Sequence, residues 1–208
     1  LFGEYCFDGC TSLEHISIPS SVNTIGKNCF SNSGLKNIAI PKSITSLSHG
    51  CFQGCSQLVN VDIPSSVTSI GYACFSGCTS LEAIAIPSSV TSIEGCIFKN
   101  CSNLKDVSLP STLSTITYES FSGCSSLTSI TIPDSVELIW EGAFQGCTSL
   151  KEVYIKNVWL LDKTGLGKDV KVIPTAAEGE EMAKVQAPIE IQPLTLSYSG
   201  KKSFQSRI

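Results

Sequence analysis

The sequence predicts a solenoid, with a parallel β-sheet on one face and short strands, turns and helical turns on the other. Three sets of residues recur at nearly the same interval and carry this prediction. Phenylalanine returns about every 23 residues, at Phe7, Phe30, Phe52, Phe75, Phe98, Phe121 and Phe144. Leucine and proline keep the same interval, at Leu13, Leu35, Leu58, Leu81, Leu104, Leu127 and Leu150, and at Pro19, Pro41, Pro64, Pro87, Pro110 and Pro133. One repeat cannot bury its own apolar face but stacked repeats can, so we expect an elongated rod or arc.

Each repeat contains one segment typical of a β-strand with a single buried face. In Leu81–Ile86, apolar residues alternate with small or polar ones. The equivalent inward pairs are Ile16/Ile18, Ile38/Ile40, Val61/Ile63, Val107/Leu109, Ile130/Ile132 and Val153/Ile155. Proline ends most of these segments because it has no N–H for a strand ladder. We expect strands of successive coils to pair in parallel, roughly 4.8 Å apart.

The rest of each repeat predicts a short extended segment and a turn. The apolar pair Val90 and Ile93, in a stretch rich in serine and threonine, favours extended backbone. The stretch Gly71–Gly77 is long enough for only one or two helical turns. Glycine or asparagine closes that stretch in six repeats, which indicates a backbone position with positive φ. These residues are Gly9, Gly54, Gly77, Asn100, Gly123 and Gly146.

Written out, the repeat is L-x-x-I-x-I-P-x-x-V-x-x-I-x-x-x-C-F-x-G-C-x-x, which closely resembles the BspA-like class of leucine-rich repeats. The resemblance covers about residues 1–155 and implies a leucine-rich-repeat solenoid. The family includes many surface antigens and adhesins of bacteria and protists, so it implies protein binding at a cell surface. It carries over no catalytic residue, because the motif is structural. One repeat departs from the pattern at Ser31–Leu35, which is one residue shorter and lacks a cysteine, so we expect a local adjustment there.

The chain divides into three parts on this pattern. Residues 1–155 hold seven repeats of about 23 residues. Residues 156–185 should form a C-terminal cap, with a shortened coil and then a short amphipathic helix over 176–185. Residues 186–208 form an extended tail. Because the chain begins at Leu1 in mid-repeat, we expect it to be a fragment of a longer protein.

The cap and the tail contain candidate contact residues. Val170 and Val172 are the expected strand residues of the shortened coil, and Trp159, Leu160 and Leu161 are candidates to cover the last full coil. Alternating apolar residues in the tail suit addition of a strand to a sheet edge, although the tail is equally suited to capping the solenoid. These residues are Ile189, Ile191, Leu194, Leu196 and Tyr198.

Composition excludes several classes of partner. Only 15% of residues are charged and the net charge is −4, which argues against nucleic acid because that partner needs clustered Lys and Arg. No apolar run approaches the roughly 18 residues of a membrane-spanning helix, so we expect no membrane insertion within this segment. The partner that the resemblance implies is a protein.

The eleven cysteines admit three interpretations. A regular disulfide framework conflicts with the odd count and with the one-per-coil placement, and a chain of this size does not need it. A metal site would use C-x-x-x-C pairs such as Cys51/Cys55, but Cys124 stands opposite Ser120 instead. The sequence favours the third interpretation, in which cysteine is a small buried apolar side chain. The expected stacked column is Cys10, Cys55, Cys78, Cys101, Cys124 and Cys147.

Other polar residues point to no chemistry. His15 and His49 are isolated and no Ser-His-Asp set is identifiable, so the sequence supports no enzyme, no cofactor and no metal. Asn100 begins a glycosylation sequon but occupies the turn site, which favours a structural role. Trp140 stands where another repeat has Gly71, so it is either an exposed contact residue or is packed against the neighbouring coil.

The strand face is the candidate protein-binding surface. Its first outward column is His15, Asn37, Asn60, Ala83, Asp106, Ser129 and Glu152, and its second is Ser17, Ala39, Asp62, Ala85, Ser108, Thr131 and Tyr154. Small and weakly polar side chains of this kind accept an extended or helical partner. The face lacks dense Trp, Tyr and Arg anchors, so specificity should come from the C-terminal end, where Trp140, Tyr154, Trp159 and the tail differ from the repeats.

Two functions remain open from the sequence. The first is a non-enzymatic protein-protein interaction module, a surface or adhesive protein. The alternative is an intracellular structural or scaffold protein, associated with the cytoskeleton or a filament. The expected location is accordingly the cell surface or, for the alternative, the cytoplasm.

Overall fold

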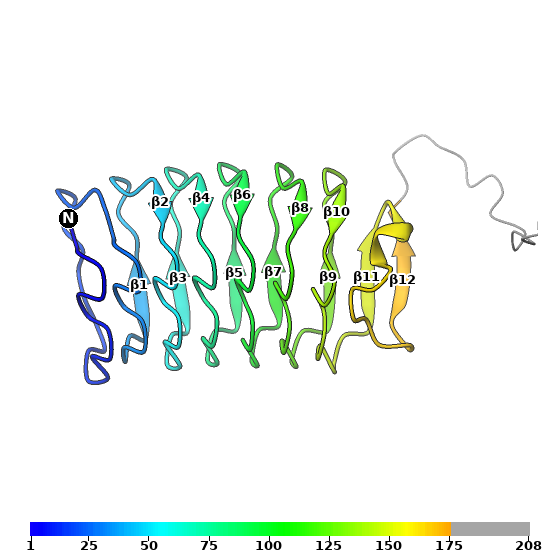
Figure 1. Ribbon diagram of the computed structural model, residues 1–208, viewed down its shortest axis with the longest axis horizontal. Helices are drawn as coiled ribbons and strands as arrows, with labels where there is room; N and C mark the ends of the chain where they lie inside the picture. The colour runs from blue at the N-terminus through cyan, green and yellow to red at the C-terminus, as the bar shows by residue number, and fades with distance from the viewer. Residues whose placement is uncertain (176–208) are drawn as a thin grey trace, which may run out of the picture. The chain divides into compact units, whose positions relative to one another are not determined.

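The computed structural model describes residues 1–175, which form a parallel β-solenoid (Figure 1). Each turn of the solenoid is a coil, named here after its phenylalanine. The front face carries β1 (Asn37–Ala39), β3 (Asn60–Asp62), β5 (Ala83–Ala85), β7 (Asp106–Ser108), β9 (Ser129–Thr131), β11 (Glu152–Ile155) and β12 (Lys171–Pro174). The back face carries β2 (Ser46–Leu47), β4 (Ser69–Ile70), β6 (Ser92–Ile93), β8 (Thr115–Ile116) and β10 (Leu138–Ile139). The predicted leucine-rich-repeat solenoid is confirmed.

The front strands align equivalent residues of successive coils. In the pair β5 and β7, Ile84 lies opposite Val107 and Ala83 opposite Asp106, so inward residues stack on inward ones. Ile84 is buried while Ala83 is exposed, as the alternation predicts. Seven parallel front strands are present, but one expectation is wrong: the segment around Ile16 forms no strand, and β12 is the seventh. The first segment makes few inter-coil backbone bonds, such as Lys36 N–H to the Glu14 carbonyl at 3.1 Å, too few for a ladder.

The turn side of each coil carries a regular backbone ladder to the next coil. In the coil of Phe75, the N–H groups of Ala73, Phe75 and Gly77 donate to carbonyls of the following coil at 2.7–3.1 Å. The N–H groups of Cys74 and Ser76, in between, donate within their own coil. In an α-helix the N–H groups of Phe75 and Gly77 would donate four residues back in the same coil, so their bonds to the next coil exclude a helix. The expected helical turns are thus only weakly supported, and within residues 1–175 the one helical segment is the 3-10 helix η1 (Val158–Leu161).

Each of these turns contains two residues with positive φ rather than one. The predicted closing set is confirmed, from Gly9 to Gly146 and including Asn100 at φ 60°. A second set lies four residues earlier, where glycine occurs only at Gly50 and Gly142. Because that position holds mostly residues with a Cβ, the repeat pattern did not indicate a positive φ there. The remaining members of this set are Tyr5, Asn28, Ala73, Cys96 and Glu119.

The core is a column of stacked phenylalanine rings with a column of thiols beside it. Neighbouring ring centroids from Phe7 to Phe144 are 5.2–5.9 Å apart, which confirms the predicted stacking. Each buried thiol of the neighbouring column donates to a phenylalanine carbonyl of an earlier coil, as Cys78 does to Phe52 at 3.1 Å. The expectation for Cys10 is wrong: it is exposed, because no earlier coil covers it in the structure.

The last described segments differ from the repeat. Leu160 and Leu161 pack against the core as expected, whereas Trp159 is 72% exposed and covers nothing. The strand β12 pairs with β11 and begins one residue after Val170, which packs partly buried against the core. The predicted helix over 176–185 and the tail over 186–208 lie outside the described residues, and the three-part division of the chain stays a prediction.

Candidate binding surfaces

The front face presents the two outward columns that the alternation predicts. Their residues are exposed in β1, β3, β5, β7 and β9, and also at His15 and Ser17. Glu152 and Tyr154 are only half-exposed, because β12 pairs alongside them and the Tyr154 hydroxyl donates to Glu152 Oε2 at 2.7 Å. The two columns from β1 to β11 contain three carboxylates and no Lys or Arg, and Lys171 of β12 lies next to Glu152 at their end. The three carboxylates are those of Asp62, Asp106 and Glu152.

Part of the front face is hollowed. An open depression of about 470 Å³ lies over the first coils, lined by His15, Ile16, Asn37, Ile38, Ala39, Asn60, Val61 and Asp62. Along one margin of the face, ion pairs join neighbouring coils: Lys36 to Glu14 at 2.8 Å and Lys105 to Glu82 at 3.0 Å. The hydrogen bond from Lys36 lowers the pKa of Glu14. These pairs are exposed and so contribute little to stability.

A row of aromatic residues lies where the back face meets the turn side, and the sequence did not predict it. His49 Nε2 lies 2.9 Å from Glu94 Oε2 and its ring contacts Tyr72, so His49 is not isolated. The ring centroids of Tyr72 and Tyr118 are 6.2 Å apart although a whole coil separates them. Gly95 permits this approach, since a Cβ there would lie 2.7 Å from the Tyr118 ring. The pattern of glycine between two tyrosines at repeat spacing was the available signal.

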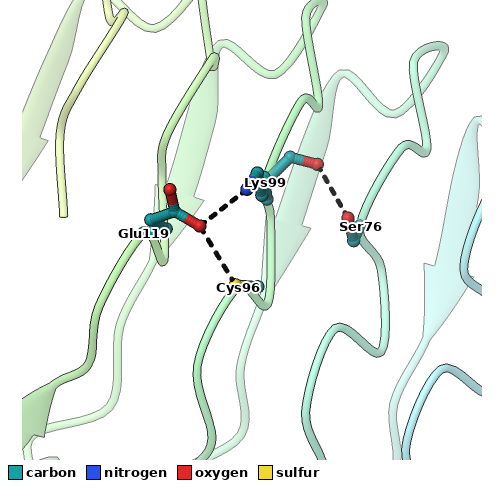
Figure 2. Close-up of polar contacts among 4 residues, drawn as sticks. All are labelled: Ser76, Cys96, Lys99 and Glu119. Atoms are coloured by element: carbon teal, nitrogen blue, oxygen red, sulfur yellow. Dashed lines mark hydrogen bonds and ion pairs between the residues drawn. The ribbon is translucent and has the colours of Figure 1, made fainter. Parts of the chain in front are cut away.

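A second group of polar residues joins three coils on the turn side (Figure 2). Lys99 Nζ lies 2.6 Å from Glu119 Oε2, and Cys96 Sγ donates to the same oxygen at 3.5 Å. Ser76 Oγ donates to the Lys99 carbonyl at 3.3 Å. The Lys99 hydrogen bond lowers the pKa of Glu119, while burial raises the pKa of the Cys96 thiol. Cys96 therefore stays protonated, and this group provides no activated nucleophile.

The tryptophans predicted as contacts are exposed. Trp140 is 50% exposed and Trp159 is 72% exposed, so Trp140 is not buried against its neighbour. Trp140 borders an open groove of about 370 Å³ on the back face. The apolar residues of the tail, from Ile189 to Tyr198, lie outside the described residues, and their role as contacts stays a prediction.

Neither a metal centre nor a membrane span is found in the part of the chain that the structure describes. Within residues 1–175 no three His, Cys, Asp or Glu side chains converge as metal ligands would, and no helix has the length and hydropathy to cross a bilayer. All eleven cysteines lie in this range and are free, and nine of them are buried.

Comparison with known proteins identifies the repeat. The sequence matches the BspA type Leucine rich repeat region in 6 copies, over residues 1–105 and 68–163. The chain therefore belongs to the BspA-type leucine-rich-repeat family. Repeats of this family form protein-interaction or adhesion-type modules, and leucine-rich-repeat solenoids are generally non-enzymatic.

Solved structures agree with this assignment. A leucine-rich repeat protein from Bacteroides ovatus is 27% identical with a TM-score of 0.71, over 83% of this chain and 42% of that one. The leucine rich repeat protein of T. pallidum is 31% identical with a TM-score of 0.65, over 71% of this chain and 70% of that one. A third, from Eubacterium ventriosum, is 34% identical with a TM-score of 0.50, over 62% of this chain and 41% of that one. The chain thus spans less than half of the Bacteroides protein, and no curated protein matches it.

Proposed function

We propose that the chain is a surface or adhesive binding module that holds a protein partner across its front face. The observation that carries this proposal is the chemistry of the two outward columns, which combine small side chains with three carboxylates and no Lys or Arg. Such a face lets a partner lie flat across several strands and favours a partner surface with positive charge. The depression between His15 and Asp62 adds a hollow that a protruding side chain can fill.

A large side chain introduced on the front face tests whether the partner binds there. Ala85 is exposed at the centre of the face, so Ala85→Arg should abolish binding of the partner to immobilised protein without unfolding the coil. Ser65→Arg adds the same side chain at an exposed turn outside the two columns and is the matched control. Equal binding by both variants would contradict the proposal.

The tail is proposed to add to this contact. Deletion of residues 186–208 should weaken binding of the partner, while the melting temperature of the protein stays unchanged. If binding is unchanged and the melting temperature falls, the tail caps the solenoid and has no part in docking.

The alternative, an intracellular scaffold, is equally compatible with the cysteines. Nine of the eleven free cysteines are buried thiols, which suit a reducing compartment as well as any other. Labelling of intact cells with a membrane-impermeant amine reagent separates the two functions. Labelled native protein supports a surface module, and protein labelled only after lysis supports the scaffold.

A further inference from the structure

The back sheet is interrupted between two coils. Strands β2, β4 and β6 form one sheet and β8 and β10 another, whereas β6 and β8 do not pair. In the preceding coil, the N–H groups of Thr91 and Glu94 donate across to their neighbour at 3.1 Å. The equivalent N–H groups of Ser114 and Thr117 make no hydrogen bond within residues 1–175. The back-face ladder is therefore broken at this point, although β6 and β8 stay in contact.

Side-chain volume accounts for the gap. Ile97 occupies the position that Cys74 has one repeat earlier. Leu113 occupies the position that Val90 has one repeat earlier. Both line the same small internal space between the two coils. The phenylalanine column is tilted there: the rings of Phe98 and Phe121 are inclined by 28°, although their centroids stay 5.6 Å apart. The larger side chains hold the two back strands apart, because a close-packed core cannot absorb added methylenes without a shift.

The gap opens into the groove of about 370 Å³ beside Trp140. Ile93 and Leu113 line it, and Leu138 and Trp140 form its apolar border. Leu138 is 47% exposed, so this border is open to a partner. The helix η1, which bears the exposed Trp159, contacts β10 on the side away from the gap. Two tryptophans on neighbouring elements are the type of anchor that the front face lacks.

The two charged residues next to the exposed border of the groove in sequence are both acidic. The lining stretches 91–93, 113–117 and 138–140 contain no charged residue. Glu137 and Glu141 flank β10 on either side of the Leu138 and Trp140 border, both are exposed, and neither forms an ion pair within residues 1–175. An exposed tryptophan between two free carboxylates complements a cationic side chain, which is attracted by both the ring face and the charges.

We propose that this groove binds an extended segment of a partner protein that carries arginine or lysine next to an apolar residue. The cation lies over the Trp140 ring between Glu137 and Glu141, and the apolar side chain packs between Ile93 and Leu138. This site is separate from the front face and does not depend on its function.

Labelled peptides test the charge preference. A short fluorescein-labelled peptide that alternates arginine with valine should bind the whole chain in fluorescence anisotropy at about 0.15 M salt, where long-range attraction is screened. A peptide with glutamate in place of arginine should not bind. Because the chain has two tryptophans, Trp159→Phe leaves Trp140 as the sole reporter, and its fluorescence should change on binding. Absence of binding by the arginine peptide overturns the proposal.

Matched variants test the location. Trp140→Ala should lower the affinity for the arginine peptide by about tenfold or more, as expected for an aromatic anchor that the peptide covers. Trp140→Phe should restore part of that affinity. Tyr5→Ala removes an exposed aromatic far along the chain and should have no effect. The double change Glu137→Gln and Glu141→Gln should weaken binding of the arginine peptide. The double change Asp62→Asn and Asp106→Asn on the front face should leave this binding unchanged. An equal loss of affinity from both double changes would show non-specific charge attraction and would refute binding in the groove.

The same variants separate this proposal from the front-face function. Ala85→Arg should leave peptide binding intact even where it abolishes the protein partner. Circular dichroism melting of Trp140→Ala should match the wild type, since half of that side chain is exposed. A folded Trp140→Ala variant that binds the peptide normally overturns the proposal.

Discussion

At the scale of single residues, close contacts between coils decide which side chains are tolerated. Gly34 lies in the shortened repeat, and a Cβ built there would lie 2.0 Å from the Thr11 carbonyl oxygen. A Cβ at position 95 would contact only the side-chain ring of Tyr118, which can move. Buried thiols are held equally tightly, since each donates to a carbonyl of an earlier coil. The neighbouring coil therefore requires glycine at position 34 and favours cysteine in the thiol column.

Gly34→Ala should lower the free energy of unfolding by about 2–3 kcal/mol, because the clash is with backbone and forces two coils apart. Gly3→Ala is the matched control, since nothing lies within 4 Å of its Cβ and its φ is not positive. Urea denaturation measures both. A Gly34→Ala protein as stable as the control would contradict the close approach.

The buried thiols should make the fold sensitive to alkali. Burial raises the pKa of Cys101 to about 12 from an ordinary value of 9.0. Between these values the unfolded chain loses the proton and the folded chain keeps it, so stability is full below about pH 9 and falls as pH rises. Cys101→Ala should reduce this slope by about 1.4 kcal/mol per pH unit in that window, measured by urea denaturation at several pH values. Cys6→Ala, which removes an exposed thiol, is the matched control.

At the scale of elements, the turn ladder is regular while the sheets are short. Front strands pair in separate groups, β1 with β3, β5 with β7, and β9 with β11 and β12. The turn N–H groups link successive coils from Tyr5 to Phe144. The ladder requires two positive φ values per turn, and at the second site most coils accept a residue with a Cβ. Strain of roughly 1–2 kcal/mol at each such residue is the cost of this geometry.

Ala73→Gly should therefore stabilise the protein by up to about 1 kcal/mol, because glycine has no Cβ penalty at φ 52°. Ala85→Gly, on extended backbone of the front face, should destabilise it by about 0.5–1 kcal/mol through loss of chain entropy. Thermal melting of the two variants shows whether each change raises or lowers the stability. Destabilisation by both changes would show that Ala73 is not strained.

At the scale of the whole molecule, each coil is stabilised mainly by its two neighbours. The phenylalanine column passes through the seven repeats, so a central ring stacks on one ring on each side. Phe144 stacks only on Phe121, and Phe7 stacks on Phe30 with the edge of Phe2 beside it. Stability in such an array is a combination of coil and interface contributions rather than of one central core. The front face and the back groove are therefore held in place by neighbouring coils only.

Hydrogen exchange should reflect this arrangement. The N–H groups of Phe75 and Phe98, in the middle of the ladder, should exchange more slowly than those of Phe7 and Phe144. Phe75→Ala should cost about 3–5 kcal/mol and divide unfolding into two transitions, one on each side of the lost ring. Uniform protection along the chain with a single transition would contradict this.

The sequence alone determined the coil, because side chains that repeat at one interval can be buried only by stacking. The phenylalanine column, the front strands and the closing positive φ positions all follow from that interval. Tertiary structure decided the rest. The turns are not helical because alternate N–H groups donate to the next coil, and this depends on a neighbour that no single repeat contains. Trp140 faces solvent beside a gap in the back sheet, since Ile97 and Leu113 differ in volume from their equivalents and only packing converts that difference into a groove.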